Sequence, residues 1–339
     1  MKIKIPLAIL TLLLLILAGC NKDTDTQKPA QDAGSNEIAV EVKEVPEIEV
    51  VPKSPTTGLP VRKDDAEMNS FAVMVENSPK ARPHTGLVDA DVVYEMEVEG
   101  NVTRFLAIFN DHIPEKVGPV RSSRHYYLPI AESWNVPYIH FGGSPQAYAR
   151  LGNLSVPTID GIYQAKYFER DNSRYAPHNA YLYTSRLSNF EQELMNDKFE
   201  FDENASYENS STSTAVNITY NNFTRLTHQY DSESNLYNRY LEGKPHYDRE
   251  TGEQIKANNV IVMYAGHHAI PGDKAGRIDV TLTGEGEAEF FLDGQVVKGK
   301  WKNEENNLRF YVGNDIISLN PGKTWIQVVN VNKKSNVTY

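Results

Sequence analysis

The fold of the first part of this chain is decided by Val92-Val93-Tyr94-Glu95-Met96-Glu97-Val98, in which side chains alternate between two faces as in a β-strand. Glu99-Gly100-Asn101 follows as a turn signal, and residues 103–109 form a second apolar run. We therefore predict an antiparallel hairpin. Glu95 and Glu97 would stand about 6.5–7 Å apart on one face, a separation that also suits paired catalytic acids. Alternating glutamates are typical of a solvated strand face, and we favour that interpretation.

Strands and helices alternate around this hairpin. Ser144 is a preferred N-cap and Pro145 suits the first helical position, so a helix is expected to begin there. Apolar residues at helical spacing predict another helix over 122–134. The remaining expected elements are strands at 71–75 and 138–141 and a helix at 184–195. Together they predict a mixed α/β N-terminal domain over residues 56–200.

The second part of the chain reads differently. Residues 201–215 are rich in Ser, Thr, Asn and Glu and are interpreted as a linker. Short alternating runs then follow, with hairpin turn signals at Asp293-Gly294 and Gly313-Asn314. We predict a β-rich C-terminal domain over residues 216–339. The fold class expected for the whole chain is therefore α+β.

The first twenty residues are typical of export. Lysines at positions 2 and 4 precede an apolar run over 5–18, which is too short to span a bilayer but suits a signal peptide. The run ends in Leu17-Ala18-Gly19-Cys20, which resembles the bacterial lipobox. We predict a signal peptide over 1–19, lipid such as palmitate on Cys20, and a flexible tether over 20–55. The alternative is a plain signal peptide with a chance cysteine.

Composition excludes several classes of function. The 339 residues include 34 basic and 45 acidic side chains, for a formal net charge of −11. This charge argues against a nucleic-acid partner, because counterion release needs a basic surface. One cysteine permits no intramolecular disulfide and no zinc site built on two cysteines. The sequence contains no HExxH, GxSxG, Walker A or dinucleotide motif, and we expect no cofactor.

Arginine is concentrated in one segment of this acidic protein. Residues 104–178 contain six arginines and two lysines, and the planar guanidinium suits bidentate binding of carboxylate or phosphate. We therefore predict an anion site near two helix starts, with Arg121 and Arg124 on one helix face. The predicted ligand-binding residues are Arg104, Arg121, Ser122, Arg124, His140, Gly142, Gly143, Ser144, Arg170, Arg174, His178 and Asn179. In the alternative, the arginines pair internally with Glu95, Glu97, Glu99, Asp160 and Asp171.

Two weaker signals involve histidine. His140 stands at the end of an expected strand and is the weak candidate for acid–base catalysis, although a lone histidine is more often structural. His267-His268 with Asp273 suggests a metal site, but adjacent strand residues face opposite ways, so we predict no metal.

Several motifs resemble the YerB-like lipoproteins of Gram-positive bacteria, and the resemblance covers nearly everything after the tether. They include Thr57-Gly58-Leu59-Pro60, residues 90–95, residues 117–124, His140-Phe141-Gly142-Gly143-Ser144, Ala176-Pro177-His178-Asn179 and residues 319–325. Gly100-Asn101 departs from an expected glycine pair. The resemblance implies a lipoprotein with a separate C-terminal domain, and it implies no catalytic residue.

These observations lead to one favoured function and two alternatives. We expect a lipid-anchored protein on the extracytoplasmic face of the cell membrane that binds an anionic envelope ligand, such as a wall-polymer phosphate or a muropeptide carboxylate. One alternative is a hydrolase or transferase that acts on such a polymer. The other is a scaffold for envelope proteins.

Overall fold

The predicted hairpin lies at the centre of the fold. β2 (Val92–Val98) pairs antiparallel with β3 (Val102–Phe109), and β1 (Phe71–Glu76) pairs antiparallel with the other edge of β3. Almost every residue of the three strands is buried, so both faces of this part of the sheet are covered. The turn between β2 and β3 contains Asn101 at φ 54°, a backbone conformation that asparagine tolerates well. The hairpin prediction is confirmed.

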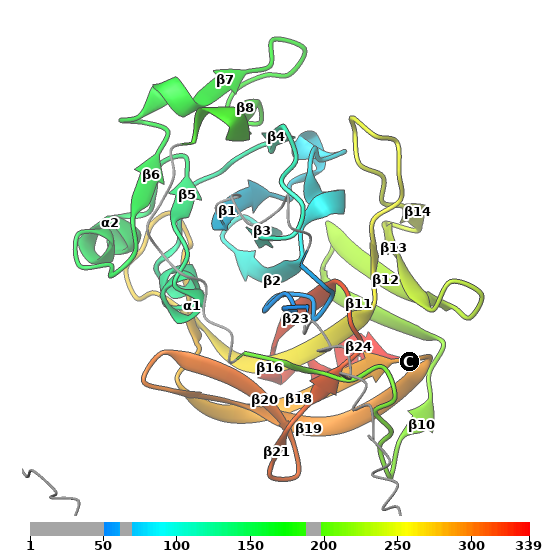
Figure 1. Cartoon of the computed structure of the whole chain (residues 1–339). Coiled ribbons are helices and arrows are strands. Elements are labelled where there is room, and N and C mark those ends of the chain that lie inside the picture. Colours follow the sequence, from blue (N-terminus) through cyan, green and yellow to red (C-terminus); the bar gives the residue numbers. More distant parts are fainter. Residues whose placement is uncertain (1–50, 62–69, 188–197) are drawn as a thin grey trace, which may run out of the picture. The chain divides into compact units, whose positions relative to one another are not determined.

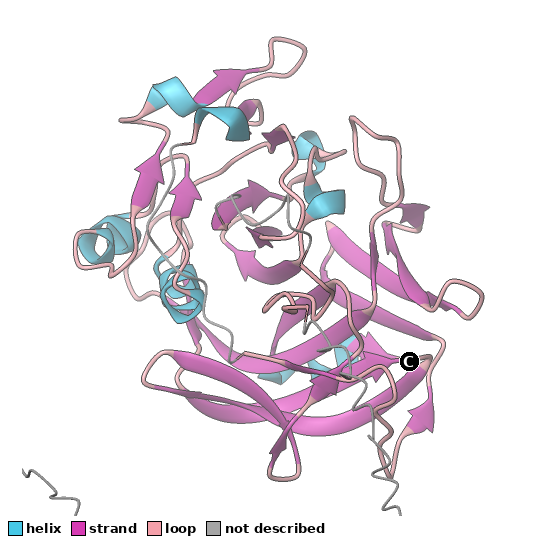
Figure 2. Cartoon of the chain, viewed as in Figure 1, coloured by secondary structure: helices cyan, strands magenta, loops and turns pink. Residues whose placement is uncertain are grey.

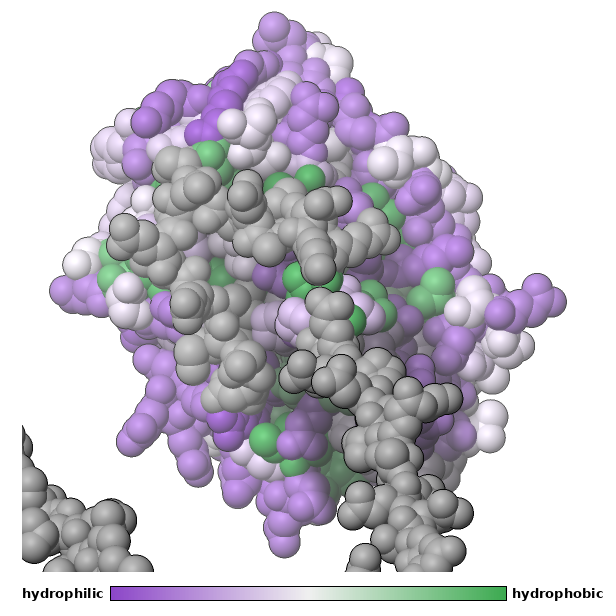
Figure 3. Space-filling model, viewed as in Figure 1, coloured by the Kyte–Doolittle hydropathy of each residue, from purple (hydrophilic) through white to green (hydrophobic). Residues whose placement is uncertain are grey.

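The computed structural model describes residues 51–61, 70–187 and 198–339, which belong to the compact unit Val50–Tyr339. Cys20, the signal peptide and nearly all of the tether lie outside the described residues. Among the described residues, no helix has the length and hydrophobicity needed to cross a membrane. The face of the molecule in Figure 3 is mostly hydrophilic, with hydrophobic residues scattered between the polar ones.

One large sheet joins the two parts of the chain (Figure 1). Its central strand is β23 (Thr324–Asn330), which lies parallel to β2 on one side and to β16 (Asn259–Ala269) on the other. Beyond β1 the sheet continues with β5 (Tyr138–His140) and β6 (Thr158–Asp160). Beyond β16 it continues with β18 (Gly284–Leu292), β19 (Gln295–Glu304), β20 (Asn307–Val312) and β21 (Asp315–Ile316). Strands from both sides of the predicted linker therefore belong to one sheet. Independent folding of the two domains stays a prediction.

A second sheet covers one face of the large sheet. It has the order β14-β13-β12-β11-β24, with β15 also paired to β13. The bounds are β11 (Ala215–Asn221), β12 (Thr224–Asp231), β13 (Leu236–Leu241), β14 (Lys244–Pro245), β15 (Lys256–Ala257) and β24 (Val337–Thr338). Buried residues alternate with exposed or half-buried ones along β11, β12 and β13, as expected for a sheet with one covered face. Ile218 and Tyr237 of this sheet pack in one cluster with Val93 and Phe105 of the hairpin.

Within the described residues, the first predicted helix is shorter than the sequence predicts, and the second begins where expected (Figure 2). α1 spans Leu128–Trp134 and follows a 3-10 turn at His125–Tyr127, so the predicted start at residue 122 is wrong. Pro129 explains the difference, because proline is tolerated in the first turn of a helix but not in its interior. α2 (Pro145–Leu151) begins as predicted, and the Ser144 hydroxyl accepts a hydrogen bond from the Ala147 N–H at 3.1 Å.

Of the third predicted helix, the described part is a 3-10 turn at Thr184–Arg186, followed by extended Leu187. Residues 188–195 of that prediction lie outside the described residues. Strands therefore dominate, and the predicted α/β mixture of the first part is present only in part. Small strands complete the structure: β4 (Lys116–Val117), β7 (Phe168–Arg170), β8 (Ala180–Tyr183), β9 (Glu200–Phe201), β10 (Ser211–Thr212), β17 (Ile278–Thr281) and β22 (Ser318–Leu319).

Glu95 overturns the prediction of a solvated strand face. Its side chain is 0% exposed, and its Oε2 accepts a hydrogen bond from Arg239 Nη2 at 2.8 Å. Asn77 Nδ2 and Thr103 Oγ1 donate to Oε1 at 3.0 and 2.7 Å. The second sheet covers this face of the hairpin and brings Arg239 from β13, so the charge of Glu95 is neutralised inside the protein.

Two histidines extend this buried network from Arg239 to the backbone of Glu76. Arg239 Nε donates to His246 Nδ1, His246 Nε2 donates to His84 Nδ1, and His84 Nε2 donates to the Glu76 carbonyl. Each bridging ring accepts one hydrogen bond and donates another, which requires its neutral form. Burial lowers the pKa of His84 to about 3 and lowers that of His246 as well, which agrees with neutral rings.

Candidate functional site

The carboxyl ends of three neighbouring parallel strands meet at one edge of the large sheet. β1, β5 and β6 run parallel, side by side in Figure 1, and end at Glu76, His140 and Asp160. Ligands of open α/β sheets bind outside the carboxyl ends of such strands. We therefore expect the predicted anion site at this edge of the sheet.

Glu76 lies at the centre of a polar cluster on this edge. His178 Nδ1 and Ser78 Oγ each lie 2.9 Å from its Oε1, and Arg121 Nε lies 3.6 Å from the same oxygen. The Glu76 side chain is only 5% exposed. Its Oε2 has no hydrogen-bond partner among the described residues, so one buried carboxylate oxygen remains unsatisfied in the site.

A second charged cluster lies beside the first, because Glu76 of β1 is the register partner of Arg104 of β3. Arg124 donates to both carboxylate oxygens of Glu99, with Nε at 2.7 Å from Oε2. Arg104 Nη2 lies 3.5 Å from Glu99 Oε1, and its Nη1 donates to the Ser122 carbonyl at 2.5 Å. Both arginines are thus held by the protein itself, as the internal-pairing alternative proposes for Glu99.

The electrostatics of the two clusters leave a positive surplus. Burial and the charge of Arg124 lower the pKa of Arg104 to about 10, although Glu99 acts in the opposite direction. Burial tends to raise the pKa of Glu99, but the hydrogen bond from Arg124 and both guanidinium charges lower it to about 2. The two clusters together contain three guanidinium groups and two carboxylates. Without counting His178, their net charge is one positive unit.

Arg121 differs from the other arginines predicted for the site, because its guanidinium makes no hydrogen bond to another described residue and its Nε is buried without a partner. Its side chain is 26% exposed, and its charged contact is Glu76. The sequence predicts that Arg121 and Arg124 share a helix face, but the structure differs. Residues 121–124 precede the 3-10 turn, and Arg124 has extended backbone angles. Arg121 is the predicted arginine with donors free for a ligand.

Arg170 and Arg174 hold the loop that carries His178. Arg170 Nη1 donates to Asn179 Oδ1 at 2.7 Å, and its guanidinium lies 5.0 Å from the centre of the Phe141 ring. Arg174 Nη1 and Nη2 donate to the carbonyls of Ala81 and Pro83 at 2.5 and 2.7 Å. Arg170, Arg174 and Asn179 therefore hold the loop in place. Arg104, Arg121 and Arg124, by contrast, lie close enough together for their charges to interact.

The glycine loop after β5 forms another wall of the edge. Gly142 has φ 76° and its N–H donates to Asp160 Oδ1 at 2.8 Å, while Gly143 bridges to Ser123. His140 is 1% exposed, and its Nδ1 donates to the Gly142 carbonyl at 2.8 Å. Burial lowers the pKa of His140. The ring positions the loop, and this geometry does not support the catalytic role considered for it.

The remaining predicted loop residues have mixed surroundings. Ser122 Oγ donates to the Phe141 carbonyl at 3.1 Å, and Ser144 caps α2, a helix of seven residues. Sequence reasoning missed Glu76 and Ser78. A signal was present, because Glu76 is the first charged residue after the apolar run at 71–75 and therefore marks the carboxyl end of a buried strand.

The weak metal signal has no support in the structure. His267 Nδ1 lies 3.4 Å from Glu97 Oε2, while Asp273 pairs with Arg277 at 2.9 Å. Among the residues that the structure describes, no group of three or more potential ligands could hold a metal ion.

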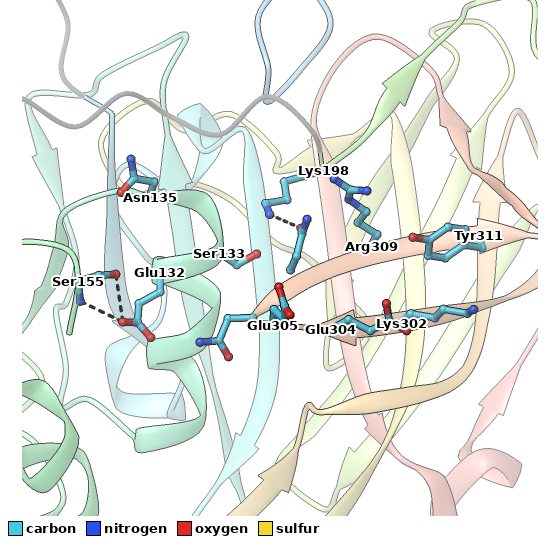
Figure 4. A pocket seen from close by; sticks show the side chains of 12 residues that line it. Glu132, Ser133, Asn135, Ser155, Lys198, Lys302, Glu304, Glu305, Arg309 and Tyr311 are labelled. Atoms are coloured by element: carbon cyan, nitrogen blue, oxygen red, sulfur yellow. Dashed lines mark hydrogen bonds between the residues drawn. The ribbon is translucent and has the colours of Figure 1, made fainter. Parts of the chain in front are cut away.

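Figure 4 shows a hollow of about 750 Å³ whose lining includes none of Arg104, Arg121 and Arg124. Its walls mix acidic and basic side chains, including Glu132, Glu304, Lys198, Lys302 and Arg309. None of the predicted site residues lines it. Ser155 holds Glu132 with two hydrogen bonds, so part of this polarity is satisfied internally.

The architecture defines a class of protein with one large mixed sheet. Its central strand, β23, joins β2 of the first part of the chain to β16 of the second, and charged residues lie at the carboxyl ends of β1, β5 and β6. The crystal structure of YerB protein from Bacillus subtilis shares this fold with a TM-score of 0.74 and 31% identity, over 85% of this chain and 99% of that one.

Sequence comparison identifies the family. The model of the DUF3048 N-terminal domain matches residues 56–206, and that of the DUF3048 C-terminal domain matches residues 216–326; both are described as protein of unknown function. The curated protein "Putative lipoprotein YerB" of Bacillus subtilis (strain 168) is 34% identical over 287 residues, covering 82% of this chain and 86% of that protein. The chain belongs to the DUF3048 family, which confirms the predicted resemblance.

Proposed function

We propose that this protein is anchored by lipid at Cys20 to the outer face of the cell membrane and binds an anionic group of the cell envelope at Arg121. One observation carries the binding proposal. The guanidinium of Arg121 has hydrogen-bond donors without a partner among the described residues, and it lies beside two further arginines in a protein of net charge −11. The lipobox at residues 17–20 and the name of the Bacillus relative, a putative lipoprotein, support the anchor.

The charge of the site limits the ligand. A net surplus of about one positive charge is matched by one negative charge, such as a carboxylate or the phosphate of a phosphodiester. Wall polymers linked by phosphodiesters and muropeptides that carry carboxylates both provide such groups. Arg104 and Arg124 contribute through their field, while Arg121 offers the hydrogen-bond donors.

The test measures binding of purified wall teichoic acid and of muropeptides to the full-length chain in detergent by isothermal titration calorimetry. Arg121→Ala should weaken binding by about 1.5–3 kcal/mol, the range for a hydrogen bond to a charged group. Arg225→Ala is the matched control, because Arg225 lies on β12 with a 65% exposed side chain paired to Glu242. Equal affinity of wild type and Arg121→Ala would refute the proposal.

A further inference from the structure

We propose that His178 is a general acid–base catalyst, and that the site cleaves a phosphodiester held by Arg121. The inference rests on the proposed anion binding and adds a reaction to it. It also moves the catalytic role from His140, which is buried, to a histidine on the exposed side of the same sheet edge.

The orientation of His178 is the first argument. Its Nδ1 lies 2.9 Å from Glu76 Oε1, and a carboxylate at this distance accepts the Nδ1 proton and fixes the tautomer. The unprotonated nitrogen is then Nε2, which has no partner among the described residues. The side chain is 19% exposed. A ring with one nitrogen fixed by a buried carboxylate and the other open to solvent is the arrangement that a general base requires.

The shared carboxylate oxygen is the second argument. Arg121 Nε and His178 Nδ1 both approach Oε1 of Glu76, at 3.6 and 2.9 Å. An anion that binds the outer donors of Arg121 therefore lies near the His178 ring. In a phosphodiester the anionic group is itself the electrophile, whereas a bound carboxylate would leave the reacting bond elsewhere. The geometry favours a phosphodiester for this reason.

The reaction uses water as the nucleophile. His178 Nε2 takes a proton from water as the water oxygen forms a bond to phosphorus. The bond from phosphorus to the departing alkoxide breaks, and the proton on His178 passes to that oxygen. The products are a phosphomonoester and an alcohol. Arg121 stabilises the charge on the phosphoryl oxygens, and Glu76 stabilises the protonated ring.

Glu76 is a positioning residue in this scheme, and the loop contacts extend its effect. Ser78 Oγ also donates to Glu76 Oε1 at 2.9 Å, which orients the carboxylate. Arg174 ties the loop of His178 to the carbonyls of Ala81 and Pro83. The buried end of the dyad is thus fixed from two segments of the chain.

The experiment incubates the full-length chain in detergent with bis(p-nitrophenyl) phosphate and, separately, with purified wall teichoic acid. Release of nitrophenolate is followed by absorbance, and phosphomonoester products are identified by mass spectrometry. His178→Asn is the decisive variant, because the asparagine amide can still donate to Glu76 but offers no base at the Nε2 position. We expect turnover to fall by about 10²–10⁴-fold with little change in affinity.

Two further variants complete the design. Glu76→Gln should lower kcat and shift the acidic limb of its pH profile, a change that a merely structural role would not produce. His112→Asn is the matched control, since His112 is exposed in the loop after β3 and should keep wild-type turnover.

The outcomes separate this inference from the proposed function. Teichoic acid binding that depends on Arg121, with no phosphomonoester product from either probe, would overturn catalysis and leave anion binding intact. Turnover that persists in His178→Asn would also overturn the role of His178. Loss of both binding and turnover in Arg121→Ala, with only turnover lost in His178→Asn, is the expected result.

Discussion

Replacing Glu95 with glutamine should destabilise this protein severely. The side chains of Glu95 and Arg239 are both 0% exposed, so each charge depends on the other for compensation. The variant keeps the oxygen that accepts from Asn77 and Thr103, but it places an amide donor against Arg239 Nη2. Arg239 then remains buried with no counter-charge.

The magnitude follows from this geometry. Removing one partner of a buried ion pair costs about 3–5 kcal/mol, because the remaining charge is uncompensated. Folded domains are typically stable by about 5–15 kcal/mol, so the variant loses a large share of the total. Glu97→Gln on the same strand provides the comparison. Glu97 pairs with Lys333, whose side chain is 36% exposed, so the lysine left behind can be solvated and the loss should be smaller than for Glu95.

The assay is equilibrium unfolding in urea, followed by tryptophan fluorescence and fitted to a two-state transition. Trp325 is a suitable reporter, because the Arg239 guanidinium lies 4.3 Å from the centre of its ring. If Glu95→Gln loses no more free energy of unfolding than Glu97→Gln, the reasoning about the buried pair is refuted.

Three other perturbations test separate features. Cys20→Ser should leave the protein unlipidated, as an uncleaved precursor or free of membranes, and membrane fractionation that still finds a mature lipidated form would contradict the lipobox. The folded pKa of Glu99, about 2, lies below its ordinary 4.5, so its interactions with Arg124 and Arg104 should contribute about 3 kcal/mol of stability above pH 4.5, which is lost as the pH falls toward 2. Acid unfolding of Glu99→Gln should lack this loss, and an acid unfolding profile identical to that of wild type would contradict the prediction. Ser144→Ala removes the hydrogen bond to Ala147 and should lower the free energy of unfolding by about 1 kcal/mol in urea, whereas an unchanged midpoint would show that the cap is dispensable.

Local pattern predicted the hairpin and the start of α2, because both depend on neighbours in the sequence. It failed for Glu95, whose partner Arg239 lies 144 residues further along the chain. Alternation showed that Glu95 and Glu97 share a face, but nothing local shows that a second sheet covers that face. Pro129, by contrast, was visible in the sequence and marked the late start of α1.

The candidate site shows the same division. The excess of arginine over lysine pointed to the right segment, yet composition could not separate Arg121, which has free donors, from Arg174, which binds backbone carbonyls. That difference depends on which carbonyls the folded chain presents. Glu76 was open to prediction from its place after a buried strand, whereas its contact with His178, 102 residues later, was not.

The central place of β23 affects how the chain must be made. Residue 325 pairs with residue 93 and also with residue 260, so the middle of the large sheet consists of a segment that is synthesised after the sheet's other strands. Until then the edges of β2 and β16 are exposed, and long-range strand pairing of this kind slows folding and favours aggregation. A chain that stops short of residue 324 lacks the strand that joins the two halves of its sheet. Termination just before residue 324 should therefore yield protein that is degraded rather than an active fragment.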